Sequence, residues 1–219
     1  MAILLFANGD MPPDSTWLEA YFDQATVVVA ADGGANHVIA AGHWPDLIIG
    51  DVDSWTLEEE LPGREATIEL VLLAKDKDET DLEAALHLIA EKEEWRQEPI
   101  LLFGTLGGRL DQTMSNVLLL ALPVLVGREV RLVEPYQTAW LVDDDFEIEG
   151  EPGDTVSLIP LGGDALVRET NGLRWKLEDE WLRFGPARGV SNEMTGSTAL
   201  VKVGSGRLLC VHVKKSWGR

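Results

Sequence analysis

The stretch TVVVAADGGANHVIA (residues 26–40) joins an apolar run to a glycine pair and then to a segment suited to a helix. The β-branched residues of the run favour an extended strand. Gly33 and Gly34 free the backbone to turn before the helix begins. A strand that passes through a short glycine turn into a helix is the repeating unit of a parallel α/β sheet. This stretch therefore predicts one strand-helix unit of such a sheet.

The same alternation continues on both sides of this stretch, up to about residue 142. Apolar runs predict strands at residues 3–7, 26–30, 47–49, 68–73, 99–103 and 129–133. Helices are expected at residues 15–24, 35–41, 81–94 and 112–122. In the third helix, apolar residues recur at three-to-four spacing and share one face: Leu82, Ala85, Leu86 and Ile89. Residues 1–142 are therefore expected to form an α/β domain with a mostly parallel sheet.

The pattern changes after residue 142. A run of three aspartates (143–145) and the turn GEPG (150–153) follow, and long helical periodicity disappears. Short strands separated by glycine-rich turns are expected at residues 155–159, 165–169, 173–177, 197–203 and 207–213. Residues 143–219 are therefore expected to form a small antiparallel β-sandwich domain. The predicted fold class is α/β followed by all-β.

Composition excludes several classes of partner. The 219 residues contain 18 Lys and Arg against 38 Asp and Glu, a formal net charge of -20, so no nucleic-acid partner is expected. The single cysteine, Cys210, rules out an internal disulfide and suits a reducing, cytoplasmic setting. The most apolar run (117–126) is interrupted by Pro123 and is too short to span a bilayer, so no membrane partner is expected either.

Acidic residues gather after the third predicted strand, in GDVDS (50–54). In an extended segment, residues two apart point the same way, which places Asp51 and Asp53 side by side. Two crowded carboxylates repel one another unless a cation joins them, and oxygen ligands suit Mg²⁺. The segment indicates a metal site, with a capped turn as the alternative.

Three more segments follow strands of the same predicted sheet, where loops at the carboxyl ends of strands line a ligand crevice. DGGAN (32–36) offers a glycine turn ahead of a helix, although Asp32 also suits a plain helix cap. KDKDETD (75–81) adds Asp78 and Asp81 to the acidic residues, or simply caps the next helix through Thr80 or Asp81. GTLGGRLDQ (104–112) places three glycines and Arg109 before a helix, which indicates a phosphate cradle or a long turn with a surface arginine.

Taken in order, DGGAN, GDVDS, KDETD (77–81) and GGRLDQ (107–112) resemble the motifs of the thiamine pyrophosphokinase family. TNGLRWKL (170–177) and GVSNE (189–193) extend the resemblance through the second half of the chain. The resemblance implies a transfer of pyrophosphate from ATP to the hydroxyl of thiamine, with Mg²⁺ assisting attack on the β-phosphorus and AMP leaving. It also implies a homodimer with sites at the subunit interface.

The resemblance further assigns roles to residues. Asp51, Asp53 and Asp81 are the expected catalytic magnesium ligands, with Asp32 beside them and Arg109 as a catalytic cation. Residues expected to contact ATP or its phosphates are Asp32, Gly33, Gly34, Asn36, Thr80, Gly108, Arg109, Asp111 and Gln112. Residues expected to contact thiamine are Thr170, Trp175, Ser191 and Asn192.

Two other functions remain open at this point. An enzyme of the same build could transfer pyrophosphate to a hydroxymethylpterin, since some such enzymes share the aspartate motifs. A protein of another class, a nucleotide or metal sensor without catalytic activity, could keep the same fold. The nature of the alcohol and the release of AMP distinguish these hypotheses from the first.

Overall fold

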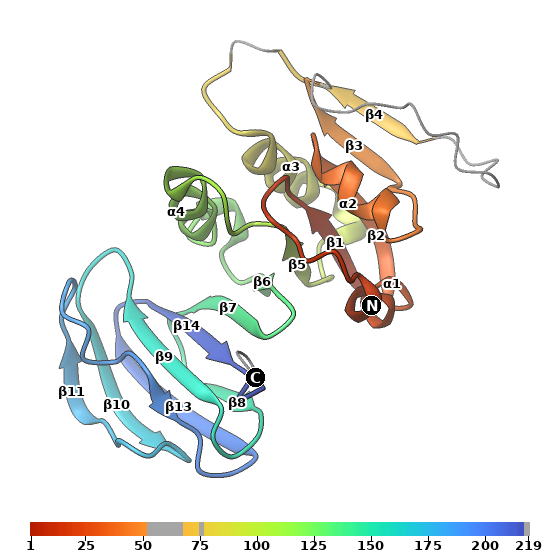
Figure 1. Ribbon diagram of the computed structural model, residues 1–219. Helices are drawn as coiled ribbons and strands as arrows, with labels where there is room; N and C mark the ends of the chain where they lie inside the picture. The colour runs from red at the N-terminus through yellow and green to blue at the C-terminus, as the bar shows by residue number, and fades with distance from the viewer. Residues whose placement is uncertain (52–67, 75–76, 217–219) are drawn as a thin grey trace. The chain divides into compact units, whose positions relative to one another are not determined.

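The computed structural model describes residues 1–51, 68–74 and 77–216 of the chain. The chain divides into two compact units, Met1–Val133 and Glu134–Arg219. The first contains an open sheet with helices, and the second contains strands alone in its described part (Figure 1). Both predicted kinds of architecture, α/β and antiparallel β, are therefore confirmed.

The sheet of the first unit runs in the order β6-β5-β1-β2-β3-β4. Every pairing between these strands is parallel. The strands match the six predicted runs within a residue or two: β1 (Ala2–Phe6), β2 (Ala25–Ala31), β3 (Leu47–Gly50), β4 (Glu69–Leu72), β5 (Ile100–Phe103) and β6 (Val130–Val133). Because all six point the same way, their carboxyl ends meet at one edge of the sheet.

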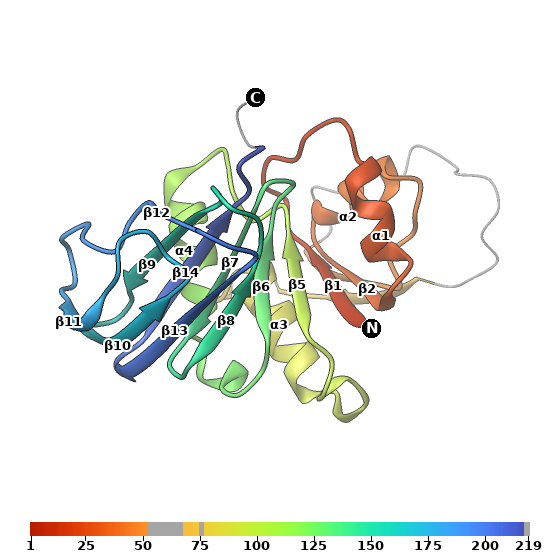
Figure 2. The same ribbon diagram turned by 90° about the horizontal axis from the view of Figure 1, so that it is seen from below.

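Helices cover both faces of this sheet. The α-helices are α1 (Glu19–Phe22), α2 (Gly34–Ala40), α3 (Asp81–Glu91) and α4 (Leu110–Leu119), and single 3₁₀ turns lie at Thr16–Leu18, Glu93–Trp95 and Pro123–Leu125. Figure 2 shows α1 and α2 on one side of β1 and β2, and α3 on the other. The predicted apolar face of α3 is buried. It contacts β2 and β3, and also the 3₁₀ turns at Glu93–Trp95 and Pro123–Leu125.

The core of the first unit is built around β1, all of whose residues are buried. Leu4 and Phe6 pack with Leu18 and Val38 on the face that carries α1 and α2. The Phe6 ring stacks on that of Phe103 in the neighbouring strand, with ring centroids 4.8 Å apart. A strand covered on both faces must be apolar at successive positions, which is why this segment reads as one continuous apolar run.

The second unit contains two antiparallel sheets, with strand orders β12-β9-β14-β7 and β11-β10-β13-β8. Residues from both sheets, among them Trp140, Leu158, Val167, Val201 and Cys210, share one buried cluster. The strands are β7 (Gln137–Val142), β8 (Phe146–Glu149), β9 (Thr155–Pro160), β10 (Ala165–Asn171), β11 (Glu178–Leu182), β12 (Asn192–Glu193), β13 (Thr198–Ser205) and β14 (Leu208–Val213). The predicted β-sandwich is confirmed. Strand β7, which precedes the boundary expected at residue 142, pairs with β14 in this unit.

One predicted strand, at residues 173–177, is wrong. This segment forms a turn in which the Leu177 amide donates to the Thr170 hydroxyl at 2.9 Å. Leu173 and Leu177 are buried because the turn folds back onto the sandwich core, so their apolar character reflects packing rather than a strand. The strand of this region is β11 instead. Its polar sequence hid it, because β11 is an edge strand that pairs only with β10 among the described strands.

Among the described residues, no helix is both long enough and apolar enough to cross a membrane.

Gly34 generates a prediction about stability. Helix α2 approaches β1 so closely that a Cβ atom at position 34 would lie 2.1 Å from the backbone oxygen of Phe6. We expect Gly34→Ala to lower the free energy of unfolding by more than about 2 kcal/mol, because neither backbone can yield without disturbing the sheet. Urea unfolding measures the change. Gly196→Ala is the matched control, since nothing lies within 4 Å of a Cβ there, and the two variants losing equal stability would contradict the prediction.

Glu134 generates a second prediction. Its Oε1 is buried and has no hydrogen-bond partner among the described residues, and burial raises the pKa of its carboxyl from 4.5 to about 7. The folded state therefore holds a proton on Glu134 that the unfolded state loses above pH 4.5, so this residue's contribution to stability falls as the pH rises from 4.5 to 7.

We expect Glu134→Gln to remove this pH dependence and to stabilise the protein at pH 8 by about 1–2 kcal/mol, after allowance for partial solvent screening. Thermal unfolding followed from pH 4.5 to pH 8 measures both effects. The exposed residue Glu147, changed to Gln, serves as the control. Parallel pH curves for the wild type and Glu134→Gln would contradict the prediction.

Candidate active site

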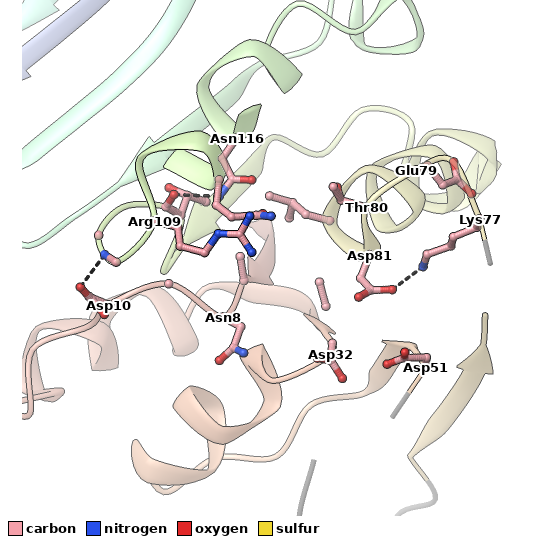
Figure 3. A pocket seen from close by; sticks show the side chains of 18 of the residues that line it. Asn8, Asp10, Asp32, Asp51, Lys77, Glu79, Thr80, Asp81, Arg109 and Asn116 are labelled. Atoms are coloured by element: carbon pink, nitrogen blue, oxygen red, sulfur yellow. Dashed lines mark hydrogen bonds and ion pairs between the residues drawn. The ribbon is translucent and has the colours of Figure 1, made fainter. Parts of the chain in front are cut away.

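A cavity of about 550 Å³ lies at the edge of the first unit where the parallel strands end (Figure 3). Its walls come from the segments that follow β1, β2, β3, β4 and β5, and from α3 and α4. The sequence motifs of four of these segments were predicted to converge, and the described parts of all four reach the same cavity. The parallel pairing of the strands is what brings them together.

Three of the expected acidic residues, Asp32, Asp51 and Asp81, line this cavity. The Asp32 amide donates to the Ile49 carbonyl at 2.8 Å, which ties the end of β2 to β3. Asp51 follows directly after β3, and Asp81 is the first residue of α3. Asp53, the fourth expected carboxylate, lies outside the described residues.

The donor set of these carboxylates fits a hard divalent cation such as Mg²⁺. The Oδ1 atom of Asp32 is buried and has no hydrogen-bond partner among the described residues, which marks it as an oxygen suited to an ion or a ligand. Within the described part of the chain, no three Asp, Glu, His or Cys side chains already stand close enough to hold a metal. In the structure Asp81 is paired with a cation of the chain, Lys77, instead.

The segment before α3 is held by two local interactions. The Lys77 ammonium donates to Asp81 Oδ1 and forms an ion pair with it four residues along the chain. The Thr80 hydroxyl accepts a hydrogen bond from the Glu83 amide at 3.1 Å and so caps α3. The helix cap expected at Thr80 is therefore confirmed, and Asp81 of the same segment lines the cavity.

The glycine loop after β5 forms the opposite part of the wall, through Gly107, Gly108 and Arg109. Arg109 is the residue that caps α4, and Gln112 in the first turn of that helix also lines the cavity. The unpaired amides at the start of a helix favour anions, and the guanidinium adds a positive charge. This wall is chemically suited to phosphate.

Asp10 and Asn8, which follow β1, were missed in the sequence analysis, although both line the cavity. The Asp10 carboxylate accepts a hydrogen bond from the Gly108 amide at 2.8 Å. Gly107 has a φ of +90°, and a Cβ there would lie 2.5 Å from that of Asp10, so the contact requires a glycine. The available signal was positional: ANGD (7–10) follows the first predicted strand in the same way as the other motifs follow theirs.

Arg109 and Asp111 are joined to each other. The Arg109 Nε donates to Asp111 Oδ1 at 3.1 Å, and a second hydrogen bond joins the other nitrogen and oxygen of the pair. Hydrogen bonding between the two side chains raises the pKa of Arg109 and lowers that of Asp111. Both are well exposed to solvent, so the pair orients the guanidinium more than it stabilises the fold.

A buried polar pair supports the floor of the cavity. Asn116 of α4 donates to the Thr105 carbonyl at 2.8 Å, which fixes the helix against the end of β5. The Thr105 hydroxyl is buried and has no partner among the described residues. Like Asp32 Oδ1, it is a polar atom of the cavity wall that a ligand would satisfy.

Some expected ATP contacts lie outside this cavity. Gly33 and Gly34 are buried where α2 meets β1, and Asn36 is exposed on α2. Asp111 also lies outside the cavity lining, although it is bonded to Arg109, which is part of it. The cavity thus brings together the following expected residues: Asp32, Asp51, Thr80, Asp81, Gly108, Arg109 and Gln112.

The expected thiamine contacts lie in the second unit, around the turn at residues 173–177. The Asn192 side chain accepts from the Trp175 amide at 3.0 Å and donates to the Trp175 carbonyl at 2.6 Å. Thr170 is buried, and its hydroxyl holds the same turn through Leu177. Ser191 adopts a left-handed backbone, with a φ of +61°, and its amide donates to the Ser157 hydroxyl at 3.0 Å. These contacts leave the Trp175 side chain at the surface, with 49% of the residue exposed.

Comparison with known proteins agrees with both units. The sequence profile described as "Thiamin pyrophosphokinase, catalytic domain" matches residues 18–132, and the profile "Thiamin pyrophosphokinase, vitamin B1 binding domain" matches residues 145–208. The first match alone spans more than half of the chain. The two matched ranges fall within the two compact units of the structure.

Individual relatives carry the likeness over nearly the whole chain. A thiamine pyrophosphokinase of Bacillus subtilis is 28% identical over 196 residues, 89% of this chain and 90% of the relative. Thiamin pyrophosphokinase 1 of Caenorhabditis elegans is 26% identical over 226 residues, 97% of this chain and 90% of the relative. The crystal structure of the enzyme from Bacillus subtilis superposes with a TM-score of 0.83 at 25% identity, covering 98% of this chain and all (100%) of that one.

The profile matches, the relatives and the shared fold lead to one conclusion: this chain belongs to the thiamin pyrophosphokinase family.

Proposed function

We propose that this chain transfers the pyrophosphoryl group of ATP to the hydroxyl of thiamine, giving thiamine diphosphate and AMP. The observation that carries the proposal is the cavity of the first unit, which places carboxylates suited to a metal opposite a glycine-arginine wall suited to phosphate. Membership of the thiamin pyrophosphokinase family supplies the reaction class and the substrate.

In this proposal the residues of the cavity wall position the triphosphate and balance its charge. Arg109 holds the phosphates through its guanidinium, which Asp111 keeps oriented. Gly108, the start of α4 and Gln112 complete the proposed phosphate contacts. Gly33 and Gly34 act indirectly, by letting α2 lie close to β1 so that Asp32 faces the cavity.

The carboxylates of Asp51, Asp53 and Asp81, with Asp32 beside them, are proposed to hold Mg²⁺. When bound, the ion would neutralise the charge that develops on the phosphates during transfer. The chain's own contribution is to hold the hydroxyl of thiamine in line with the β-phosphorus and to exclude water. The buried oxygen of Asp32 supports the assignment, since it needs a partner that the described residues do not supply.

Thiamine is proposed to bind at the exposed ring of Trp175 in the second unit. Hydrogen bonds to Asn192 hold the backbone of Trp175, so its flat aromatic ring is carried by a fixed turn. Asn192 and Thr170 then act through the turn that they hold, and Ser191 contacts the substrate from the adjoining segment. A small cavity of about 60 Å³ beside Trp175 and Asn192 lies at the same place.

We further propose that the protein forms a homodimer with its sites at the subunit interface and that it is cytoplasmic. Support for the dimer comes from α4, where Leu110, Met114 and Leu118 lie four residues apart and are all exposed. Such an apolar stripe on a helix that also lines the cavity suits burial against a second copy. Cys210 is buried and is the single cysteine of the sequence, which is compatible with a reducing compartment.

The reaction class is tested by mixing the protein with ATP, Mg²⁺ and thiamine and separating the nucleotide products. We expect AMP and thiamine diphosphate in equal amounts and no activity once the metal is chelated. ADP as the product would mean simple phosphoryl transfer. AMP release with a hydroxymethylpterin but not with thiamine would assign the enzyme to a different alcohol, and no release with either would favour a sensor.

The metal-binding carboxylates are tested by Asp51→Asn and Asp53→Asn. Each change removes an anionic oxygen ligand with little change in shape, so we expect turnover to fall by at least about 100-fold while the fold survives. Asp78→Asn is the control, because Asp78 is exposed on the same segment as Asp81 and does not line the cavity. Steady-state rates measure turnover, and circular dichroism verifies the fold. Near-normal turnover in either variant would show that the residue changed is not a metal ligand.

A further inference from the structure

Lys77 is a charged residue of the cavity that the proposed reaction has not used. Its ammonium is turned toward Asp81 and is ion-paired with it (Figure 3). The Lys77 side chain is 18% exposed and that of Asp81 is 28% exposed, so the pair is largely withdrawn from solvent. A lysine usually extends its charge into water, and keeping it inside carries a desolvation cost that only a strong partner offsets.

The charges around this pair explain why the lysine stays inside. The described cavity wall carries the carboxylates of Asp10, Asp32, Asp51, Glu79 and Asp81. Its described cations are Lys77 and Arg109, and the Arg109 guanidinium is directed onto Asp111. The positive charge that neutralises the acidic wall around Asp81 therefore comes from Lys77.

A bound metal would change this balance. A divalent cation at Asp81 takes the carboxylate oxygen that Lys77 now uses, and it repels the ammonium. Lysine has a flexible four-carbon stem and three rotatable donors, so its charge can change partner without a change in the backbone. A polyphosphate in the same cavity offers the ammonium a stronger set of acceptors than it has lost.

We propose that Lys77 is an exchangeable counterion: it neutralises Asp81 when metal is absent and moves onto the polyphosphate when metal and nucleotide bind together. This inference rests on the proposed function, because it concerns the same cavity. With metal and nucleotide bound, Lys77 would bind phosphate. Without nucleotide, Lys77 would compete with the metal for Asp81. Metal alone then binds weakly, whereas metal and nucleotide bind cooperatively, each improving the affinity of the other by the same factor.

The test uses Lys77→Gln, which removes the charge and keeps a side chain of similar reach. Binding of Mn²⁺ without nucleotide is followed by electron paramagnetic resonance, and binding of ATP at saturating Mn²⁺ is followed by calorimetry, with no thiamine in either measurement. We expect Mn²⁺ to bind about 3–10-fold more tightly, because its competitor is gone, and ATP to bind about 10-fold more weakly, because a charge-assisted contact is lost. Opposite shifts in one variant distinguish this role from a purely structural one.

The matched control is Lys202→Gln. Lys202 forms an ion pair with Glu169 in the second unit, so this variant breaks a similar pair and changes the net charge equally. We expect both affinities to stay within about twofold of the wild type there, since Lys202 does not line the cavity. Circular dichroism verifies that both variants are folded.

The outcomes separate this inference from the proposed reaction. Unchanged or weaker Mn²⁺ binding in Lys77→Gln, or a shift equal to that in Lys202→Gln, would overturn the counterion role. Unchanged affinity for ATP would overturn the movement onto phosphate. If both shifts appear as expected and the wild type forms no AMP with thiamine, the counterion exchange stands and the proposed reaction fails.

Discussion

The parallel pairing of β1 with β2 on one side and β5 on the other is the constraint on which the first unit depends. It aligns the carboxyl ends of the strands, so that segments far apart in the sequence end at one edge. Nothing local to the sequence brings together the segments at residues 7–10, 31–32, 51, 77–82 and 105–109. These segments lie close together because the strands before them run in the same direction. The arrangement is stable because β1 is buried on both faces, and a shift in its register would expose apolar side chains.

Charge is the second constraint on this edge. An acidic protein that handles a polyphosphate must supply positive charge locally, and the described wall does so with few cations. The chain satisfies several of these groups internally: Lys77 pairs with Asp81, Asp111 holds Arg109, and Asp10 accepts from the glycine loop. These contacts hold the loops around the cavity in place. The oxygen of Asp32 and the hydroxyl of Thr105 remain without such partners among the described residues.

In the second unit, buried polar side chains hold the turn that carries Trp175. Here the Asn192 side chain is buried, and its amide group forms hydrogen bonds with the backbone N–H and C=O of Trp175. The Thr170 hydroxyl holds the other end of the same turn. Because buried polar groups must be paired, such a network fixes the backbone closely and leaves the indole ring exposed on a rigid base. The polar residues of this region therefore shape the turn, and the aromatic ring of Trp175 stays exposed on it.

How much the sequence revealed depended on whether a feature is local. The strand-helix alternation, the face of α3 and the change to antiparallel strands were predicted, because burial on one or both faces leaves a periodic trace in the residues themselves. The segment at 173–177 and strand β11 were not, since a turn folded onto a core is as apolar as a strand and an edge strand is as polar as a loop.

The same division holds for the site. The sequence alone determined the types of group, carboxylates and a glycine-arginine loop, because each motif is a short run of residues that follows one strand. Only the tertiary structure decided which of them share a cavity. It included Asp10 and Asn116, it set Gly34 against a backbone carbonyl, and it paired Lys77 with Asp81. The physical reason is that motif chemistry lies within a few consecutive residues, whereas the partner of a side chain is fixed by strand pairing and packing between segments that the chain order keeps apart.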